Sequence, residues 1–314
     1  MTAPSHSREL VTGATGFVGR ALCNQLSAIG HTVIPAVRHG SGLPNEVVTS
    51  DIGSSTDWRM ALAGCDAVVH LAARVHMIRE AERDPLALYR RTNTEATLNL
   101  ARQAAQARVK RFVFISTIKV NGEGRDAPYR ETDAPAPEDA YAISKWEAEQ
   151  GLQRIAQETG LEVVILRPPL LYGPGVKANF QRLIQAVARG WPLPFGAVRN
   201  RRSLLYLGNF VDAIRLCVEH PGAAGQTFLL DDGKPVSTPD VARALARAMN
   251  RPARLLAVPV GVLQFVGTLL GKRAEVARLA GSLFLDSSAI RSRLGWKPPF
   301  SMEEGLAATV ADMA

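Results

Sequence analysis

Tyr141 and Lys145, in the stretch Tyr141-Ala-Ile-Ser-Lys145, could handle a proton together. If residues 140–159 form a helix, a spacing of four places the phenol and the ammonium on one face, one turn apart. The cation would favour the phenolate and lower the tyrosine pKa from its usual value of about 10. Such a tyrosine could give or take a proton near neutral pH. A solvated surface pair would show the same spacing, so the surrounding sequence has to decide.

Three glycines near the start, Gly13, Gly16 and Gly19, follow a short expected strand and enter a helical pattern over residues 17–29. A tight turn from strand to helix needs unusual backbone angles, and a pyrophosphate has to approach the main chain closely. Amide groups and the positive end of the helix would then meet the phosphates. The pattern predicts dinucleotide binding, with an ordinary glycine-rich turn as the alternative.

The end of the second expected strand bears on which dinucleotide binds. It reads Ala36-Val-Arg-His-Gly40 and lacks the acidic residue that would grip a ribose 2′-hydroxyl of NAD. Arg38 could receive a 2′-phosphate instead, so the sequence favours NADP(H) within the NAD(P) class. Asp51, followed by Ile52, closes the third expected strand and could accept from the adenine amino group. The alternative for Arg38 and for Asp51 is an ordinary solvated charge at a strand end.

The composition limits the partners. The chain has 314 residues and a net charge of +8, which indicates an acidic partner. Its Lys and Arg residues are scattered and not interleaved with aromatic residues, so a dinucleotide or nucleotide sugar is favoured over nucleic acid. Three widely spaced cysteines form neither a disulfide framework nor a metal cluster, and they favour a reducing compartment such as the cytoplasm.

Two segments bear on membrane insertion and export. Residues 1–7 are polar and lack the apolar core of a signal peptide. Residues 255–270 are the most apolar stretch, but they contain Pro and Gly and are shorter than the roughly 20 residues of a membrane span. We therefore expect no membrane span, and a buried helix or a hydrophobic surface patch at 255–270.

Short apolar runs alternate with helical patterns through the first two-thirds of the chain. The runs are 9–12, 32–37, 47–49, 67–70, 111–116 and 162–167. The helical patterns are 17–29, 56–63, 85–108, 140–159 and 176–189. This alternation predicts an α/β, doubly wound (Rossmann), mostly parallel sheet covered on both faces. We expect a dinucleotide-binding domain over 1–168, to which residues 203–230 return, and a smaller, mainly substrate-binding lobe over 169–314.

With these elements in order, the chain resembles the extended short-chain dehydrogenase/reductase family, in its nucleotide-sugar epimerase and 4-ketoreductase branch. The motifs that carry the resemblance are Gly13-x-x-Gly16-x-x-Gly19, Asp51-Ile52, His70-Leu-Ala-Ala73, Asn93, Phe112-Val-Phe-Ile-Ser-Thr117, Tyr141-x-x-x-Lys145, Arg167-Pro168 and Leu171-Tyr-Gly-Pro174. Each motif is weak alone, but the ordered set spans nearly the whole chain.

The resemblance implies roles for individual residues. The catalytic residues are Tyr141 as acid/base, Lys145 as its partner on the nicotinamide ribose, and Thr117 with Ser116 beside it on the reacting oxygen. The implied cofactor contacts are Gly13, Thr15, Gly16, Phe17, Val18, Gly19, Arg38, Asp51, Ile52, Leu71, Ala72, Ala73, Asn93, Tyr141, Lys145 and Pro168. Asn179 and Phe180, near the uracil and phosphates, and Arg202, in the basic run 199–203, are the implied substrate contacts. The resemblance implies no metal. It implies a homodimer that forms through helices 85–108 and 140–159.

The resemblance implies an oxidoreductase acting at C4 of a UDP-sugar. Its bacterial polysaccharide members reduce a UDP-4-keto-6-deoxy-N-acetylhexosamine, and the missing acid at residues 36–40 favours this reductase activity. NAD-dependent 4-epimerisation of the UDP-glucose/UDP-galactose type is the alternative. A dinucleotide-binding sensor without catalysis is a minor alternative, because such proteins lose the tyrosine or the lysine. A 4,6-dehydratase is disfavoured because Ile118-Lys119 follow Thr117 where that activity uses an Asp-Glu pair.

Overall fold

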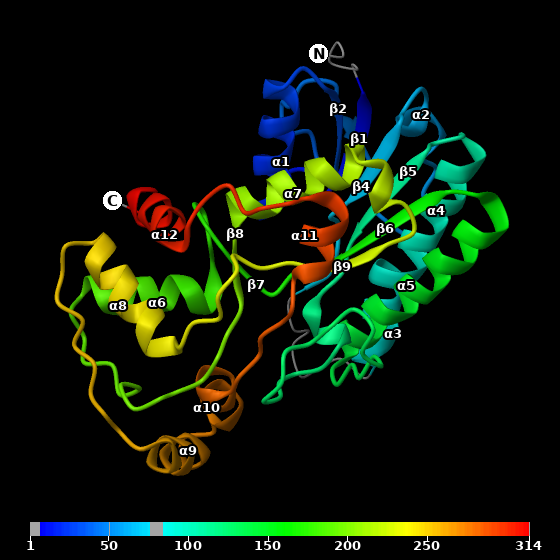
Figure 1. Ribbon diagram of the computed structural model, residues 1–314. Helices are drawn as coiled ribbons and strands as arrows, with labels where there is room; N and C mark the ends of the chain where they lie inside the picture. The colour runs from blue at the N-terminus through cyan, green and yellow to red at the C-terminus, as the bar shows by residue number, and fades with distance from the viewer. Residues whose placement is uncertain (1–6, 50, 76–83, 314) are drawn as a thin grey trace.

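A computed structural model describes residues 7–49, 51–75 and 84–313 (Figure 1). Its main feature is a seven-stranded, wholly parallel sheet with the strand order β3-β2-β1-β4-β5-β6-β9. The strands are β1 (Arg8–Thr12), β2 (Thr32–Val37), β3 (Val47–Val48), β4 (Ala67–His70), β5 (Arg111–Ile115), β6 (Glu162–Arg167) and β9 (Thr227–Leu229). The predicted doubly wound α/β fold is confirmed, and the six predicted strands match to within one residue at each end.

Two helical layers cover the sheet, as Figure 1 shows. Helices α1 (Phe17–Ala28), α7 (Leu207–Glu219) and α11 (Ser288–Leu294) pack on one face, and α2 (Arg59–Leu62), α4 (Ala96–Gln106) and α5 (Ala140–Thr159) pack on the other. Successive strand residues face opposite layers: Val11 and Val113 join the first core, and Leu10 and Phe112 the second. Burial on both faces explains why these strands are continuous apolar runs.

The predicted helix over 85–108 is divided. It consists of α3 (Pro85–Tyr89), a π-helical segment Arg90–Glu95 and α4. Asp84 caps the start through a 3.0 Å hydrogen bond from the Ala87 amide, as its position before Pro85 indicates. The π-helical segment widens the helix where Asn93 is fully buried, and such bulges occur frequently at functional sites.

A smaller lobe lies beside the sheet (Figure 1). It contains β7 (Leu170–Tyr172), α6 (Ala178–Ala188), β8 (Leu204–Tyr206), α8 (Thr238–Ala248), α9 (Val260–Leu269), α10 (Arg273–Ala280) and α12 (Met302–Ala311). Strands β7 and β8 pair in parallel, and α6, α8 and α12 enclose a separate apolar core. Short 3-10 turns lie at Ile118–Val120 and Pro221–Ala223. No helix among the described residues is long and apolar enough to cross a membrane.

The chain returns from the lobe to the sheet through α7 and β9. Arg111, the first residue of β5, is buried and donates to the carbonyls of Cys217 (2.9 Å), Val218 (3.1 Å) and His220 (2.7 Å) at the end of α7. Its guanidinium also pairs with Glu162 on β6. One side chain therefore joins the returning helix to two neighbouring strands. The domain boundary at residue 168 itself stays a prediction.

Replacing Arg111 with Met should destabilise the protein by about 3 kcal/mol, because three buried carbonyls lose their donor and Glu162 loses its partner. Urea unfolding at pH 7 measures the change. Glu162→Gln should cost less than about 1 kcal/mol, since residue 162 is partly exposed and the amide oxygen of the glutamine can still accept a hydrogen bond from Arg111. Equal losses in the two variants would contradict a role for the carbonyl contacts.

Candidate active site

The three glycines form the predicted turn between β1 and α1. Gly13 has a φ of +67°, and a Cβ there would lie 2.9 Å from the Ala72 amide nitrogen. A Cβ on Gly19 would lie 2.2 Å from the Gly13 carbonyl oxygen. The Gly16 amide donates to the same carbonyl at 2.9 Å. Larger residues at 13 and 19 would therefore open the turn and move the backbone away from any phosphate in it.

The N-terminus of α1 is free to bind an anion. Gly16 is its N-cap and supplies no side-chain hydrogen bond, and the first turn carries no acidic residue. Thr15 and Gly16 are exposed, while Phe17 and Val18 are half-buried beside them. Unpaired amides and the helix dipole at this position fit the pyrophosphate of a dinucleotide.

Arg38 and Asp51 lie at the ends of β2 and β3, where the sequence predicts the adenosine part of the cofactor. Arg38 is exposed and pairs with no acidic residue in the described part of the chain. Asp51 is exposed, accepts from the Ile52 amide at 2.9 Å and lies 3.9 Å from Arg91. A guanidinium without a partner is compatible with a 2′-phosphate, but a solvated charge would look the same.

The segment after β4 is held in place by a buried histidine. The amides of Leu71 and Ala72 donate to the Thr12 carbonyl (3.3 Å) and hydroxyl (3.2 Å). His70 lies between the hydroxyls of Thr12 (2.7 Å) and Thr97 (2.9 Å). Burial, with Lys145 nearby, lowers the pKa of His70 to about 3, so the ring is neutral. Leu71, Ala72 and Ala73 are thereby fixed next to the glycine turn.

The polar atoms of Asn93 are hydrogen-bonded within the protein. Its amide nitrogen donates to the Arg74 carbonyl (3.1 Å) and the Ser144 hydroxyl (3.0 Å), and its oxygen accepts from the Arg74 amide at 2.8 Å. The side chain is fully buried. Asn93 thereby ties the segment after β4 to α5, one residue before Lys145, and its predicted cofactor contact stays a prediction.

Tyr141 and Lys145 lie on the first two turns of α5, as the spacing predicts. Lys145 is 1% exposed, and its ammonium lies 3.9 Å from the centre of the Phe114 ring. It makes no hydrogen bond or ion pair with another described residue, so its N–H donors are free for a ligand. Tyr141 is partly buried and packs edge-on against Tyr89, with ring centres 6.1 Å apart. A buried ammonium without a partner is costly and fits a site that is completed by a ribose.

The predicted direction of the tyrosine shift is wrong for this structure. Burial raises the pKa of Tyr141, and Asp139 and Tyr89 add to the increase. Burial also lowers the pKa of Lys145 to about 7, against a smaller opposing effect of Glu149. Desolvation therefore outweighs the attraction that spacing alone suggested. The phenolate and the ammonium are each disfavoured singly, and only forming both as a pair would offset part of that cost.

Ser116 faces a buried ionic network. Its hydroxyl donates to Glu149 at 2.5 Å, and Glu149 also accepts from Arg167 at 3.0 and 2.5 Å. Arg167 reaches Asn121 at 2.9 Å. Glu149 is completely buried on α5, one turn beyond Lys145. The Ser116 hydroxyl proton is therefore taken by Glu149, and the predicted contact of Ser116 with the reacting oxygen stays a prediction.

Thr117 and Tyr141 belong to elements that an ion pair holds together. Lys119, two residues after Thr117, pairs with Asp139 at 2.7 Å, two residues before Tyr141. Asp139 also caps α5 through the Ala142 amide at 2.7 Å. The Thr117 hydroxyl accepts from the Lys119 amide at 3.3 Å and keeps its proton available to donate elsewhere. The sequence did not predict the pairing of Lys119 with Asp139, although Lys119 lies only two residues after Thr117.

Pro168 directly follows β6 and is buried. Its carbonyl accepts from the Ile118 amide at 3.1 Å, so the segment after β6 lies beside the segment after β5. The sheet thus brings the chain near Thr117 and Pro168 to one edge, as the carboxyl ends of parallel strands require.

The two predicted substrate residues on α6 differ in their exposure to solvent. Asn179 is exposed, whereas Phe180 is 4% exposed and stacks on Tyr172 with ring centres 5.5 Å apart. The Phe180 side chain belongs to the lobe core, and the predicted substrate contact at Phe180 stays a prediction. The apolar period of α6 could have revealed the burial of Phe180.

Arg202 lies at the end of the basic run, partly buried. Its guanidinium donates to the carbonyls of Arg278 (2.7 Å) and Gly281 (3.1 Å) at the end of α10. Neighbouring Arg201 stacks on Phe284 at 4.0 Å and lines an open cavity of about 300 Å³ with Arg291. None of the predicted catalytic residues lines this cavity. Arg202 has donors left for a diphosphate, because only one of its nitrogens is bound to these carbonyls.

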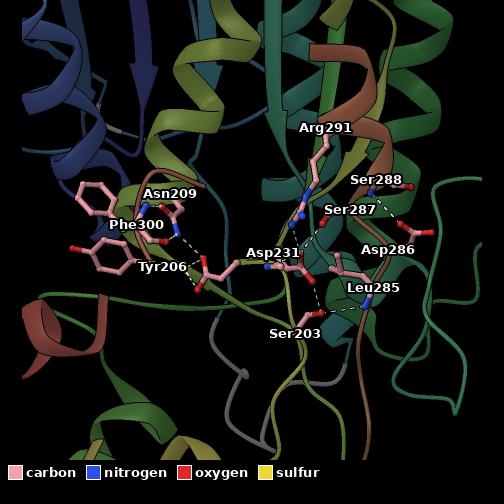
Figure 2. A network of polar contacts seen from close by, with 12 residues as sticks. Ser203, Tyr206, Asn209, Asp231, Leu285, Asp286, Ser287, Ser288, Arg291 and Phe300 are labelled. Atoms are coloured by element: carbon pink, nitrogen blue, oxygen red, sulfur yellow. Dashed lines mark hydrogen bonds and ion pairs between the residues drawn. The ribbon is translucent and has the colours of Figure 1, made fainter. Parts of the chain in front are cut away.

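Two adjacent acids after β9 position this basic run (Figure 2). Asp231 is buried and accepts from the hydroxyls of Ser203 (2.8 Å) and Ser287 (2.6 Å), while Arg291 points toward it. Asp232 accepts from Tyr206 and Asn209. Burial raises the pKa of both carboxyl groups. The Asp-Asp pair directly after an apolar run was a signal that sequence inspection did not use.

Known proteins are similar in sequence to this chain along most of its length. The NAD dependent epimerase/dehydratase family matches residues 9–230. The chain belongs to this family. A curated relative, the UDP-glucose 4-epimerase of Vibrio cholerae, is 47% identical over 308 residues, covering 96% of this chain and 93% of the relative. The resemblance to extended short-chain dehydrogenases/reductases, and the prediction of an enzyme, are confirmed.

Solved structures agree with this membership of the epimerase/dehydratase family. The UDP-N-acetylglucosamine 4-epimerase from Bacillus cereus has a TM-score of 0.80 at 22% identity, covering 98% of this chain and 99% of that one, and supports the fold. MoeE5 in complex with UDP-glucose and NAD has a TM-score of 0.78 at 27% identity, with 98% of each chain covered. In the part of the chain that the structure describes, no cluster of three or more His, Cys, Asp or Glu could hold a metal ion.

Gly19→Ala should lower dinucleotide affinity by about tenfold or more, because the added Cβ meets the Gly13 carbonyl and displaces the turn. Isothermal titration of the dinucleotide-depleted protein with NAD measures the change. Gly261→Ala serves as the control, since a Cβ there meets nothing within 4 Å, its φ is not in the left-handed region and the residue lies on α9 in the lobe. Unchanged affinity in Gly19→Ala would contradict the assignment of the turn.

Lys145→Met should change how stability depends on pH. With a folded pKa near 7 and an unfolded pKa near 10.5, wild type binds fewer protons folded than unfolded between these values. Its stability should therefore rise through that window by up to about 1.4 kcal/mol per pH unit. The Met variant should lose this rise, and the exposed-site control Lys297→Met should keep it. Urea unfolding at pH 6.5 to 9 measures the free energy of unfolding. If it varies with pH in parallel for wild type and Lys145→Met, the lowered pKa of Lys145 is contradicted.

Proposed function

We propose that the protein is an NAD-dependent 4-epimerase of a UDP-sugar. The observation that carries the proposal is the 47% identity, along almost the entire chain, to a protein named UDP-glucose 4-epimerase. Further support comes from Tyr141, from Lys145 one helical turn away, which is buried and pairs with no other described residue, and from a glycine turn before α1 that fits a pyrophosphate. These site features fit both reactions, and the identity favours epimerisation over the 4-keto reduction that the sequence favoured.

The residues would divide the work as follows. The bound dinucleotide would supply an acceptor and donor of hydride at C4 of the sugar. Tyr141 would remove the proton from the C4 hydroxyl and return it after the sugar has presented its other face. Thr117 would donate to the same oxygen, and Lys145 would bind the ribose and stabilise the phenolate as it forms. Arg202, with donors to spare, would bind the diphosphate.

Reduction of a UDP-4-keto-6-deoxy sugar is the second candidate. It is favoured by one observation, the unpaired Arg38 at the end of β2, where an acid would select NAD. Arg38 would then bind the 2′-phosphate of NADP(H), which a reductase releases after each turnover. The family description names NAD, and MoeE5 binds NAD, so NAD is the first cofactor to test.

Two further properties belong to the proposal. A cytoplasmic location is supported by three buried cysteines that are all free thiols. A homodimer through α4 and α5 follows from the resemblance and stays a prediction, which light scattering can test.

The purified protein should convert UDP-glucose to UDP-galactose without added cofactor, and it should release NAD on denaturation. Tyr141→Phe should lower this turnover by about 100-fold or more while retaining the bound dinucleotide. Tyr206→Phe is the matched control, because it removes a phenol from the lobe instead of from α5. Proton NMR follows the sugars, and mass spectrometry identifies the dinucleotide.

The opposite outcome has a clear signature. Stoichiometric consumption of added NADPH with a UDP-4-keto-6-deoxy-N-acetylhexosamine, without epimerisation of any UDP-sugar, would replace the first proposal by the second. Full activity in Tyr141→Phe would contradict the mechanism in both.

A further inference from the structure

Helix α9 in the lobe presents its larger apolar side chains to solvent. Val262, Phe265, Val266 and Leu269 follow the spacing i, i+3, i+4, i+7 and therefore share one face. Phe265 is 66% and Leu269 70% exposed, and Leu270 beyond the helix is 66% exposed. A contiguous apolar stripe of this kind on a folded surface marks an interaction site.

The opposite face of α9 holds the helix on the protein. Leu263 packs against the lobe core. Gly267 is buried against α10, where a Cβ would lie 2.6 Å from the Val276 side chain. Figure 1 shows α9 and α10 together at the end of the lobe farthest from the N-terminal part of the sheet. The exposed stripe is therefore not needed for packing within the protein.

The chain around the stripe is uniformly basic. Residues 241–274 contain no Asp or Glu, while six basic residues lie in this segment. All six are exposed: Arg243, Arg247, Arg251, Arg254, Lys272 and Arg273. Four of them flank α9 directly, two on each side. Asp240, which pairs with Arg243 at 2.8 Å, and Glu275 border this segment, but the four cations that flank α9 form no ion pair with a described residue. An exposed apolar face flanked by such cations is the pattern of helices that lie at a negatively charged bilayer surface.

We propose that α9 and its flanking basic residues dock the protein on the surface of an anionic phospholipid bilayer. The apolar stripe would enter the boundary between headgroups and acyl chains, and Arg251, Arg254, Lys272 and Arg273 would contact lipid phosphates. The ten residues of α9 rise about 15 Å, half of the roughly 30 Å hydrocarbon core, so the helix would lie in the surface.

A second copy of the chain fits this surface less well. A two-fold contact would place the same cations of both copies against one another, because such an interface uses one patch twice. Charges of the same sign repel each other at close approach, so such a contact is unfavourable. The polar residues of the helix, Gln264 and Thr268, offer little for directional pairing, since the Thr268 hydroxyl already donates to the Gln264 carbonyl at 2.8 Å.

The proposed surface is linked to the candidate active site through the basic run 199–203, in which Asn200 donates to the carbonyls of Leu279 (3.0 Å) and Gly281 (3.0 Å). Arg202, the predicted diphosphate contact, donates to carbonyls at the end of α10, the helix that packs on α9. Docking would therefore hold the basic run 199–203 in a fixed relation to the bilayer. The docking itself does not depend on which reaction the enzyme performs.

Vesicle sedimentation tests the proposal with the full-length protein. Wild type should pellet with phosphatidylcholine vesicles that contain phosphatidylglycerol, and less with phosphatidylcholine alone. The double variant Phe265→Ser/Leu269→Ser should bind the anionic vesicles about tenfold or more weakly, through loss of apolar burial. Lys272→Glu/Arg273→Glu should show a similar loss and a weaker dependence on salt.

Matched controls carry the same changes elsewhere. Met60→Ser removes a side chain that is 86% exposed on α2, and Lys297→Glu reverses an exposed charge outside the segment; both should bind as wild type. Turnover of soluble UDP-sugar should be unchanged in all variants, which shows that they fold. Wild type that stays in the supernatant, or variants that bind as tightly as wild type, would overturn the proposal. A dimer that the α9 variants dissociate, without vesicle binding by wild type, would assign the face to a second copy instead.

Discussion

The buried ion pair between Glu149 and Arg167 is the constraint on which the candidate site depends. It joins α5 to the end of β6, and through Ser116 and Asn121 it also reaches the chain that follows β5. Both charges are almost completely removed from water. Such a pair adds little net stability compared with apolar residues, but losing one partner is costly, because it leaves a buried charge alone. The pair therefore fixes geometry more than it strengthens the fold.

That geometry explains how a lysine can stay buried without a partner. Lys145 lies one turn before Glu149 on α5, so the network that anchors Glu149 also sets the position of the ammonium. Phe114 and neutral His70 line the other side, and neither can neutralise it. Asn93 fixes the neighbouring Ser144. The protein thus holds an ammonium in an unfavourable place by ordering everything around it, as a site that binds a polar ligand requires.

The sequence predicted the fold well, because the fold follows from local patterns. The strands are buried on both faces and read as apolar runs, and the turn at Gly13 needs a conformation that glycine tolerates best. The partners of individual side chains followed less well. Ser116, Asn93 and Phe180 are used inside the protein, and their partners Glu149, Arg74 and Tyr172 lie between 8 and 33 residues away along the chain. The spacing of Tyr141 and Lys145 predicted contact but not burial, so the expected pKa shift had the wrong sign.

The same limit applies to the surface that the sequence left undecided at residues 255–270. Its apolar content allowed a buried helix or an exposed patch, because both share the i, i+3, i+4, i+7 period. Gly267 decides between them: only the face that carries this small residue can approach α10 closely, so the face with Phe265 and Leu269 has to point away. The absence of acids from residues 241–274 then gives that face a chemical character that period alone does not. The packing against α10 therefore leaves the face with Phe265 and Leu269 free to bind, and the flanking basic residues favour an anionic partner.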